Sequence, residues 1–208
     1  LACLELKGLA YQIDPITPFF GDDRFAELSP LRRVPVFIDD QVTLADSSVI
    51  AQYLEERYPD RYPLLPVNVA DRARARWLEE YADTRLRQAT LPFFSEHVVK
   101  PLFQGKAADA AALATAAGPR DEAFDYLEKE LPETGLAVAR SLTVADVAIG
   151  AQLITYCQGA GPIDAGRWPR LASYLAVLQA RPHWAEVHTE EEAALAAARA
   201  RRQGTPSR

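Results

Sequence analysis

The chain has 208 residues, of which 49% are hydrophobic and 25% are charged, and its formal net charge is −6. This length suffices for one large or two modest domains with buried cores. The negative charge argues against nucleic acid or an anionic membrane as a partner, because both favour a basic surface. No apolar run approaches the ~20 residues of a membrane span. Cys3 and Cys157 are too few for a disulfide framework and lack metal-ligand spacing, so we expect a reduced cytoplasmic protein without a metal site.

The first residues predict a short helix that is followed by a strand. The chain begins at Leu1, inside this expected helix, and contains no methionine, so we expect a further segment before Leu1 in the natural product. The helix should end near Lys7, because Gly8 suits the left-handed backbone position that follows a helix. Alternating apolar and polar residues at 11–14 predict a strand. Residues 24–28 form a candidate helical turn.

The stretch from residue 33 to residue 58 predicts a hairpin and a capped helix. Residues 34–38 are rich in β-branched and aromatic side chains, which favours a strand with a proline near its start. Residues 39–41 supply turn chemistry, and residues 42–44 return as the hairpin partner. Asp46 or Ser47 can cap the following helix, which should end before Pro59.

The remainder of the chain is predicted to be helical. Three prolines within 59–66 indicate a stiff connector. The long helix after it should end at Pro101, and it carries two apolar stripes, Ala70, Ala73, Trp77 and Tyr81 on one side and Leu78, Ala82, Leu86, Ala89 and Phe93 on the other. Two stripes indicate contacts on two sides, as in a central bundle helix or a dimer interface. Further helices are expected over 122–131, from Thr143 with a capping box to Asp146, over 168–182 and from Thr189.

Two short motifs are candidates for chemistry. An X-Pro bond is cis in only ~5–6% of folded cases, so the sequence alone favours a trans Pro35 at the start of an edge strand. A cis bond would instead turn the Val34 N–H and C=O toward a ligand, where they could pair with an extended peptide. At Asp46-Ser47-Ser48 the helix start favours a carboxylate and the acid favours an ammonium, which together suit an amino-acid zwitterion. Capping alone, worth ~1 kcal/mol, is the other interpretation.

These motifs resemble the glutathione-binding region of glutathione S-transferases. The connector, the box from Thr143 to Asp146 and the segment 168–182 fit the same family, and the resemblance covers residues 1 to about 188. It implies an α/β thioredoxin-like domain at 1–58, with its first strand absent from this chain, and a Pro-rich linker at 59–66. An all-α domain would follow at 67–202, with a disordered tail at 203–208.

The resemblance also implies a role for each candidate residue of the site. Val34 would pair its main chain with the cysteinyl part of glutathione, and Pro35 would be cis. Asp46 and Ser47 would hold the γ-glutamyl amine and carboxylate, and Arg33 could reach the glycyl carboxylate. Ser48, Thr143 and Asp146 are expected to be structural.

The catalytic group is not assigned to any residue of this chain. In the family it is a Ser, Tyr or Cys that stabilises the glutathione thiolate, and it is expected upstream of Leu1. Cys3 lies too far into the first helix for that role and is expected in the core, and Tyr11 is expected to be structural. Whether the missing group is a hydroxyl or a cysteine would decide between conjugation and thiol-disulfide chemistry.

The implied function is addition of glutathione thiolate to a small hydrophobic electrophile by a cytoplasmic, detoxifying homodimer. Glutathione would be the co-substrate, and no metal is expected. Candidate wall residues for the electrophile are Tyr81, Arg85, Phe93, Phe94 and His97, although aromatics at helical spacing are more often core. The alternatives are a glutathione-dependent isomerase, dehalogenase or disulfide reductase, or a non-catalytic binding or regulatory protein on the same fold. The intact Val34-Pro35 and Asp46-Ser47 pairs argue against the non-catalytic alternative.

Overall fold

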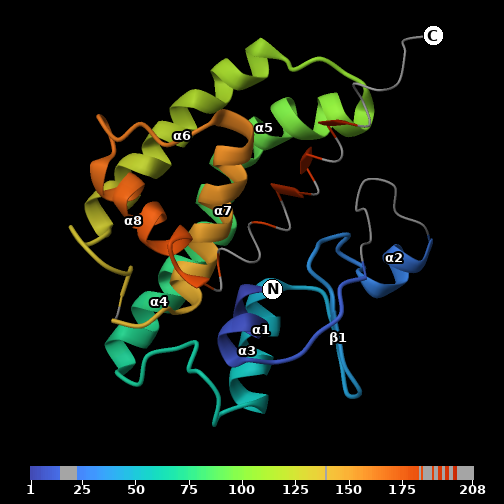
Figure 1. Cartoon of the computed structure of the whole chain (residues 1–208), viewed down its shortest axis with the longest axis vertical. Helices are drawn as coiled ribbons and strands as arrows, with labels where there is room; N and C mark the ends of the chain where they lie inside the picture. Colours follow the sequence, from blue (N-terminus) through green and yellow to red (C-terminus); the bar gives the residue numbers. More distant parts are fainter. Residues whose placement is uncertain are drawn as a thin grey trace. The chain divides into compact units, whose positions relative to one another are not determined.

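The computed structural model describes residues 1–14, 23–138, 140–182, 184, 189, 192–193, 195–196 and 199–200. The chain divides into two compact units, Leu1 with Cys3–Leu65 and Ala2 with Pro66–Arg208, which are drawn in Figure 1. Within the described ranges, no helix is both long and apolar enough to cross a membrane. The predicted disorder at 203–208 lies outside these ranges, as does much of the helix predicted from Thr189.

The first unit combines three helices with a small sheet. Its elements are α1 (Ala2–Lys7), α2 (Asp23–Leu28), β1 (Phe37–Ile38), β2 (Thr43–Leu44) and α3 (Ser47–Arg57). The left-handed Gly8, at φ 62°, ends α1 as predicted. The strand predicted at 11–14 is wrong, because within the described residues the sheet contains only β1 and β2. Alternation is not enough for a strand, since its N–H and C=O groups need a neighbouring strand.

A two-stranded antiparallel hairpin follows α2. Phe37 lies opposite Leu44 and Ile38 opposite Thr43, so both strands are shorter than the predicted 34–38 and 42–44. Pro35 has no N–H with which to extend the ladder toward its start. The turn closes when the Asp39 N–H donates to the Val42 carbonyl at 3.1 Å.

A buried lysine attaches the Pro-rich connector to the first unit. Lys7 Nζ donates to the carbonyls of Tyr58 and Tyr62 at 3.2 and 3.0 Å, and it pairs with Glu55 Oε2 at 2.8 Å. The same Glu55 oxygen accepts the Leu64 N–H at 2.9 Å. An ammonium has three donor protons, and here three acceptors surround it. Most of the connector is therefore held against α1 and α3.

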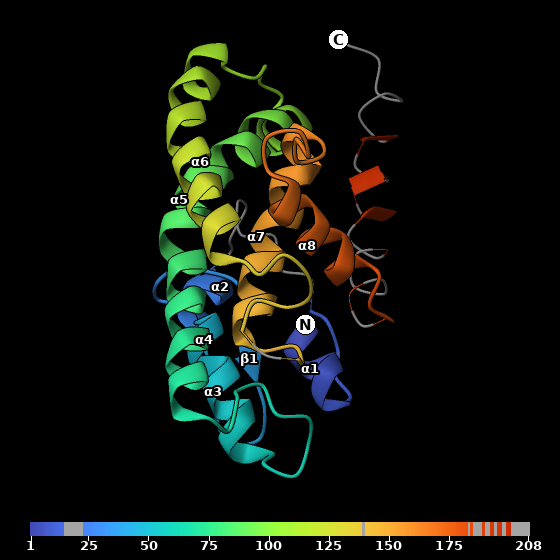
Figure 2. The same ribbon diagram turned by 90° about the vertical axis from the view of Figure 1, so that its left-hand side faces the viewer.

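The second unit is helical. Its elements are α4 (Val69–Tyr81), η2 (Ala82–Leu86), α5 (Arg87–Phe94), η3 (Ser95–Gln104), α6 (Ala110–Glu130), α7 (Val144–Ala160) and α8 (Pro169–Gln179), where η marks π-helical turns. Helix α7 packs against α4, η2, α5, η3 and α8, so it forms the centre of this unit (Figure 2).

The long helix runs from α4 through η3 without a break in its helical backbone. The predicted end at Pro101 is wrong, because η3 continues to Gln104. A proline inside a helix removes one hydrogen bond, but a π turn already shifts the pairing from i−4 to i−5. Burial of Val98 and Val99 holds this turn in place against the cost of the proline.

The two apolar stripes of the long helix have different environments. Every member of the second stripe is buried in the core, from Leu78 to Phe93. In the first stripe, Ala70 and Ala73 are exposed and Trp77 is 50% exposed, with its Nε1–H donating to the Tyr126 hydroxyl at 2.9 Å. One stripe therefore makes the core of the unit, and most of the other faces outward.

Helix α6 begins earlier than the sequence pattern indicated. It starts at Ala110 and not near Glu122, so the prediction that it spans 122–131 is too short. Asp109 caps it, with Oδ1 accepting the N–H groups of Ala111 and Ala112 at 2.9 and 3.3 Å. The alanine-rich segment lacks a hydrophobic stripe, but alanine has the highest intrinsic helix propensity.

A fully buried carboxylate organises the start of α7. Asp146 Oδ2 accepts the N–H of Thr143 at 2.8 Å and its hydroxyl at 3.0 Å, and this confirms the predicted capping box. Asp146 Oδ1 accepts the Ala137 N–H at 2.8 Å and the Tyr174 hydroxyl at 2.9 Å. Burial raises the pKa of Tyr174 well above its ordinary value, so this hydroxyl remains a donor.

Candidate functional site

The loop between α2 and β1 is held by Ser29. This residue is buried and closes a turn in which its carbonyl accepts the Arg32 N–H at 2.8 Å. Its hydroxyl donates to the Arg33 carbonyl at 2.8 Å and accepts the Arg33 N–H at 2.9 Å. The Arg33 side chain is exposed, while its main chain is fixed.

The peptide bond between Val34 and Pro35 is cis. The trans arrangement favoured by the sequence alone is therefore wrong, and the cis alternative is the one observed. Val34 is 55% exposed. Among the described residues, neither its N–H nor its C=O has a hydrogen-bond partner. An exposed main chain of this kind can pair with an extended peptide as another strand would.

Asp46 is the capping residue of α3. Its backbone is extended, and its Oδ1 accepts the N–H groups of Ser48 and Val49, both at 3.1 Å. Ser47 is the exposed first residue of this eleven-residue helix. The N–H groups of the first turn and the helix dipole make this end favourable for an anion.

The hairpin register aligns the two motifs. The turn pairs Asp39 with Val42, and the strands pair Phe37 with Leu44. Pro35 comes two residues before Phe37, and Asp46 comes two residues after Leu44, so both flank the same end of the hairpin. Neighbouring strands are separated by about 4.7–4.9 Å. The hairpin therefore directs an exposed main chain and a helix start toward the same region.

A hydrogen bond joins the hairpin turn to α3. Tyr53 donates its hydroxyl to Asp39 Oδ2 at 2.7 Å, while Asp39 Oδ1 accepts the N–H groups of Gln41 and Val42 at 2.9 and 2.8 Å. The bond from Tyr53 lowers the pKa of Asp39, and the same bond raises the pKa of Tyr53. The turn and the helix that carry the two sides of the candidate site are thus tied together.

The two thiols are poor candidates for chemistry. Burial raises the pKa of Cys157 to about 11, so its reactive thiolate is scarce at neutral pH. Cys3 is half-buried in α1.

Across the described ranges, no group of three or more His, Cys, Asp or Glu side chains is placed to hold a metal ion.

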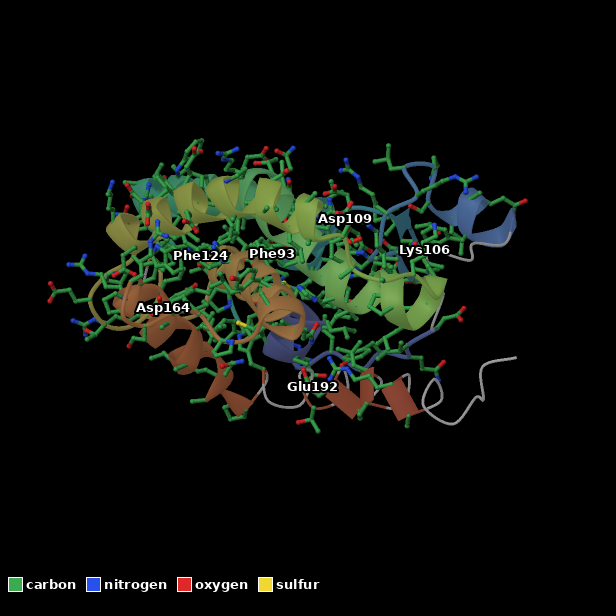
Figure 3. The ribbon with its side chains drawn as sticks, turned by 90° about the horizontal axis from the view of Figure 1, so that it is seen from above. Phe93, Lys106, Asp109, Phe124, Asp164 and Glu192 are labelled. Atoms are coloured by element: carbon green, nitrogen blue, oxygen red, sulfur yellow. The ribbon has the colours of Figure 1, made fainter. Side chains whose placement is uncertain are left out.

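The candidate wall residues differ in environment. Phe93 is a core residue whose ring meets Tyr156 edge-on at 5.2 Å, and Phe124 meets the same ring at 5.0 Å; both phenylalanines are labelled in Figure 3. Arg85 pairs with Glu122. Burial raises the pKa of Tyr81 to about 12, and its ring lies 4.4 Å from that of Tyr126. Phe94 is half-buried and His97 is exposed.

Sequence reasoning did not identify three of the residues that support this region. Ser29 directly follows the expected helical turn at 24–28, Asp39 lies in the expected hairpin turn, and Lys7 lies at the expected end of the first helix, with no further role indicated for any of them. The Ser-Pro pair after an expected helical turn is a signal for a turn, but it does not indicate which backbone groups the hydroxyl will reach.

Sequence comparison finds relatives over much of the chain. Residues 1–62 match the family described as glutathione S-transferase, N-terminal domain. The chain is 30% identical over 155 residues to glutathione S-transferase theta-1 of Rattus norvegicus, across 73% of this chain and 63% of that protein. It therefore spans less than two thirds of the length of that relative.

Structural comparison extends this similarity to the whole fold. A glutathione S-transferase from Rhodospirillum rubrum aligns with a TM-score of 0.79 at 23% identity, covering 88% of this chain and 82% of that one. One from Methylobacterium radiotolerans, in complex with glutathione sulfonate, aligns with a TM-score of 0.71 at 25% identity, covering 89% and 85%. The expected fold class, a thioredoxin-like domain followed by an all-helical domain, is confirmed.

Proposed function

The chain belongs to the glutathione S-transferase family, and from this premise we propose that it binds glutathione and adds its thiolate to a small hydrophobic electrophile. The observation that carries the proposal is the exposed main chain of Val34, which has no hydrogen-bond partner among the described residues, near the same end of the hairpin as the Asp46 cap. The solved relative that holds glutathione sulfonate supports the choice of ligand.

In the proposed complex, five residues bind different parts of glutathione. The Val34 N–H and C=O pair with the cysteinyl main chain, beside the cis Pro35. The γ-glutamyl ammonium approaches Asp46, whose known acceptor contacts both use Oδ1, so that Oδ2 is the oxygen assigned to the ligand. The γ-glutamyl carboxylate lies at Ser47 and the helix start, and the glycyl carboxylate pairs with Arg33.

The proposed chemistry begins with loss of the thiol proton. The thiolate sulfur then forms a bond to an electrophilic carbon, and the displaced electron pair leaves with the departing group or moves onto a conjugated acceptor. Holding both reactants together supplies much of the acceleration. None of the five binding residues is assigned to the activation of the thiol.

Calorimetry with glutathione on the full-length protein tests the binding site. The variant Asp46→Ala/Ser47→Ala should bind at least about tenfold more weakly, because it loses a charge-assisted contact to the ligand. Asp109→Ala is the matched control, since Asp109 caps α6 of the helical unit with the same pair of backbone contacts. It should lose similar helix stability and keep its glutathione affinity.

The outcomes of this experiment separate the alternatives. No binding by the wild-type protein would contradict the transferase proposal and leave a binding or regulatory protein on this fold. Binding without conjugation across a panel of electrophiles would redirect the search to isomerase, dehalogenase or disulfide reductase assays. Binding with conjugation, lost in the double variant, is the expected result.

We also propose that the protein acts as a cytoplasmic homodimer in detoxification. The exposed stripe of α4 supports an association, because Val69 is 77% exposed and Trp77 is 50% exposed on the same helix. An apolar helix face of this kind commonly lies in an interface. Light scattering should give twice the chain mass, and a monomer at micromolar concentration would contradict this part of the proposal.

A further inference from the structure

Ser29 makes more hydrogen bonds to the loop before Val34 than a turn requires. It lies directly after α2, is fully buried, and donates its N–H to the Phe25 carbonyl at 2.9 Å, as the next helical residue would. Phe25 is itself only 1% exposed. The serine is therefore anchored to the core of the first unit, and whatever it binds is anchored too.

Three bonds from this one residue fix the two residues that precede Val34. The Ser29 carbonyl accepts the Arg32 N–H at 2.8 Å, and Pro30 occupies the turn position that favours proline. The hydroxyl then accepts the Arg33 N–H at 2.9 Å and donates to the Arg33 carbonyl at 2.8 Å. Arg32 completes the loop in the left-handed region, at φ 51°. The peptide group on each side of the Arg33 α-carbon is thus held.

The second of these fixed peptide groups joins Arg33 to Val34. Since the Arg33 carbonyl is bonded to Ser29, the plane that contains the Val34 N–H is set by that bond. No described group inside the protein takes the Val34 N–H or C=O, and the residue is 55% exposed. The orientation of the Val34 N–H therefore depends on the serine hydroxyl.

We infer that Ser29 is a positioning residue for glutathione, acting through the Arg33 main chain to hold the Val34 N–H in the orientation that pairs with the cysteinyl part of the ligand. This inference rests on the proposed function. Ser29 is buried and binds the protein main chain on both sides, so it does not touch the ligand itself.

Loss of the hydroxyl has a defined consequence. In Ser29→Ala the Arg33 N–H and C=O lose their partners, and the loop gains freedom that binding must remove again. We expect the dissociation constant for glutathione to rise about tenfold. A tenfold change corresponds to the net free energy that one ordinary hydrogen bond contributes. Ser29→Thr retains the hydroxyl and should restore most of the affinity.

The test is glutathione calorimetry on the full-length wild type, Ser29→Ala, Ser29→Thr and a matched control, Thr90→Ala. Thr90 also has a buried hydroxyl that donates to a main-chain carbonyl, that of Leu86 at 2.9 Å, but it lies in α5 of the helical unit. Its loss should lower stability and leave glutathione affinity unchanged. Thermal unfolding of each variant accompanies the binding measurement.

Each outcome of this experiment either supports or overturns the inference that Ser29 is a positioning residue. Weaker binding in Ser29→Ala alone, restored by Ser29→Thr, supports the inference. Wild-type affinity in a folded Ser29→Ala overturns it, while the Asp46→Ala/Ser47→Ala result still stands for the proposed function. An equal loss in Thr90→Ala overturns it as well, because the effect would then follow stability. If Ser29→Ala does not fold, Ser29→Cys replaces it, because a cysteine has nearly the same shape and forms only weak hydrogen bonds. Weaker glutathione binding by a folded Ser29→Cys supports the inference, and wild-type affinity overturns it.

Discussion

The two units of this protein use their buried polar side chains differently. In the first unit, Ser29, Lys7 and Glu55 bond mainly to main-chain groups of loops, and the sheet has only two residues in each strand. In the second unit, long helices satisfy most of their own main chain, and the buried Asp146 bonds loop main chain at Ala137 and Thr143 and also the Tyr174 hydroxyl of α8. In the first unit these side chains thus hold irregular backbone in place, whereas in the second unit Asp146 also joins two helices, α7 and α8.

This contrast has a functional meaning. The candidate site consists of backbone groups at Val34 and of the exposed end of α3, and such groups face outward only if the surrounding loop is fixed by side chains. Substitutions in the first unit should therefore change ligand affinity together with local stability. Substitutions in the second unit should change stability alone. The following experiments examine the stability of each unit.

The largest effect is expected for Asp146→Ala. Four donors lose their acceptor inside a fully buried site, including the Tyr174 hydroxyl and the Ala137 N–H. The free energy of unfolding should fall by about 4 kcal/mol, as measured by urea denaturation. Asp125→Ala is the control, because its carboxylate accepts the Trp168 Nε1–H at 2.7 Å but is 47% exposed. A loss below about 1 kcal/mol in Asp146→Ala would show that this carboxylate does not organise the unit.

Lys7→Met should have the next largest effect. Methionine fills the buried space but leaves two carbonyls and Glu55 without the ammonium. We expect a loss of about 2–3 kcal/mol in unfolding free energy. Lys106→Met is the control, since Lys106 is an exposed residue after η3 (Figure 3), and it should change stability by less than about 0.5 kcal/mol. Equal unfolding free energies for the two variants would contradict the prediction that the buried Lys7 contacts stabilise the first unit.

Gly159→Ala tests the packing of helices in the second unit. A β-carbon there would lie 2.6 Å from the Phe93 carbonyl oxygen and 2.7 Å from the Phe94 α-carbon, both of which are main-chain atoms. Because rigid backbone cannot move aside cheaply, we expect destabilisation by about 2 kcal/mol. Gly118→Ala, where a β-carbon meets nothing within 4 Å, is the matched control and should change stability by less than about 1 kcal/mol. Tolerance of Gly159→Ala would mean that α5 and α7 can separate without loss.

The smallest expected effect is that of Tyr53→Phe, and it depends on pH. The Tyr53 hydroxyl is the main cause of the lowered pKa of Asp39, so its removal should raise that pKa toward the ordinary value of 3.8. A lowered folded-state pKa contributes stability above the unfolded value, and this contribution is lost as the pH falls through the folded value. The stability difference between wild type and Tyr53→Phe should therefore narrow in acid. A carbon-detected NMR titration of Asp39 measures the shift, and an unchanged pKa would contradict the assignment.

Local chemistry in the sequence was enough to predict much of this protein. Gly8 ends α1, Asp46 caps α3, and Thr143 with Asp146 forms a capping box, because each depends on a residue and its neighbours within one turn. The buried stripe of the long helix also follows from its own spacing. Its outward stripe was predicted only as a second contact, with no partner identified.

The incorrect predictions concern contacts between distant residues. Residues 11–14 alternate as a strand does, but the sheet of the described residues contains only β1 and β2. Pro101 would end an isolated helix, whereas the buried Val98 and Val99 keep this one intact. Alanine-rich residues from Ala110 show no stripe, yet a cap and high helix propensity suffice for α6. In each case burial, strand pairing or intrinsic helix propensity determined the secondary structure, and the spacing of apolar residues in the sequence does not report these contributions.

The sequence by itself determined the residue types of the candidate site and the helix start that carries Asp46 and Ser47, because capping and turn chemistry act over a few residues. Only the tertiary structure decided that Val34–Pro35 is cis, that the hairpin pairs Phe37 with Leu44, and that Ser29 holds the Arg33 main chain. The physical reason is that cis and trans proline differ little in free energy, so packing against residues outside the local segment selects the isomer. Such packing also selects the hydrogen-bond partner of a buried hydroxyl.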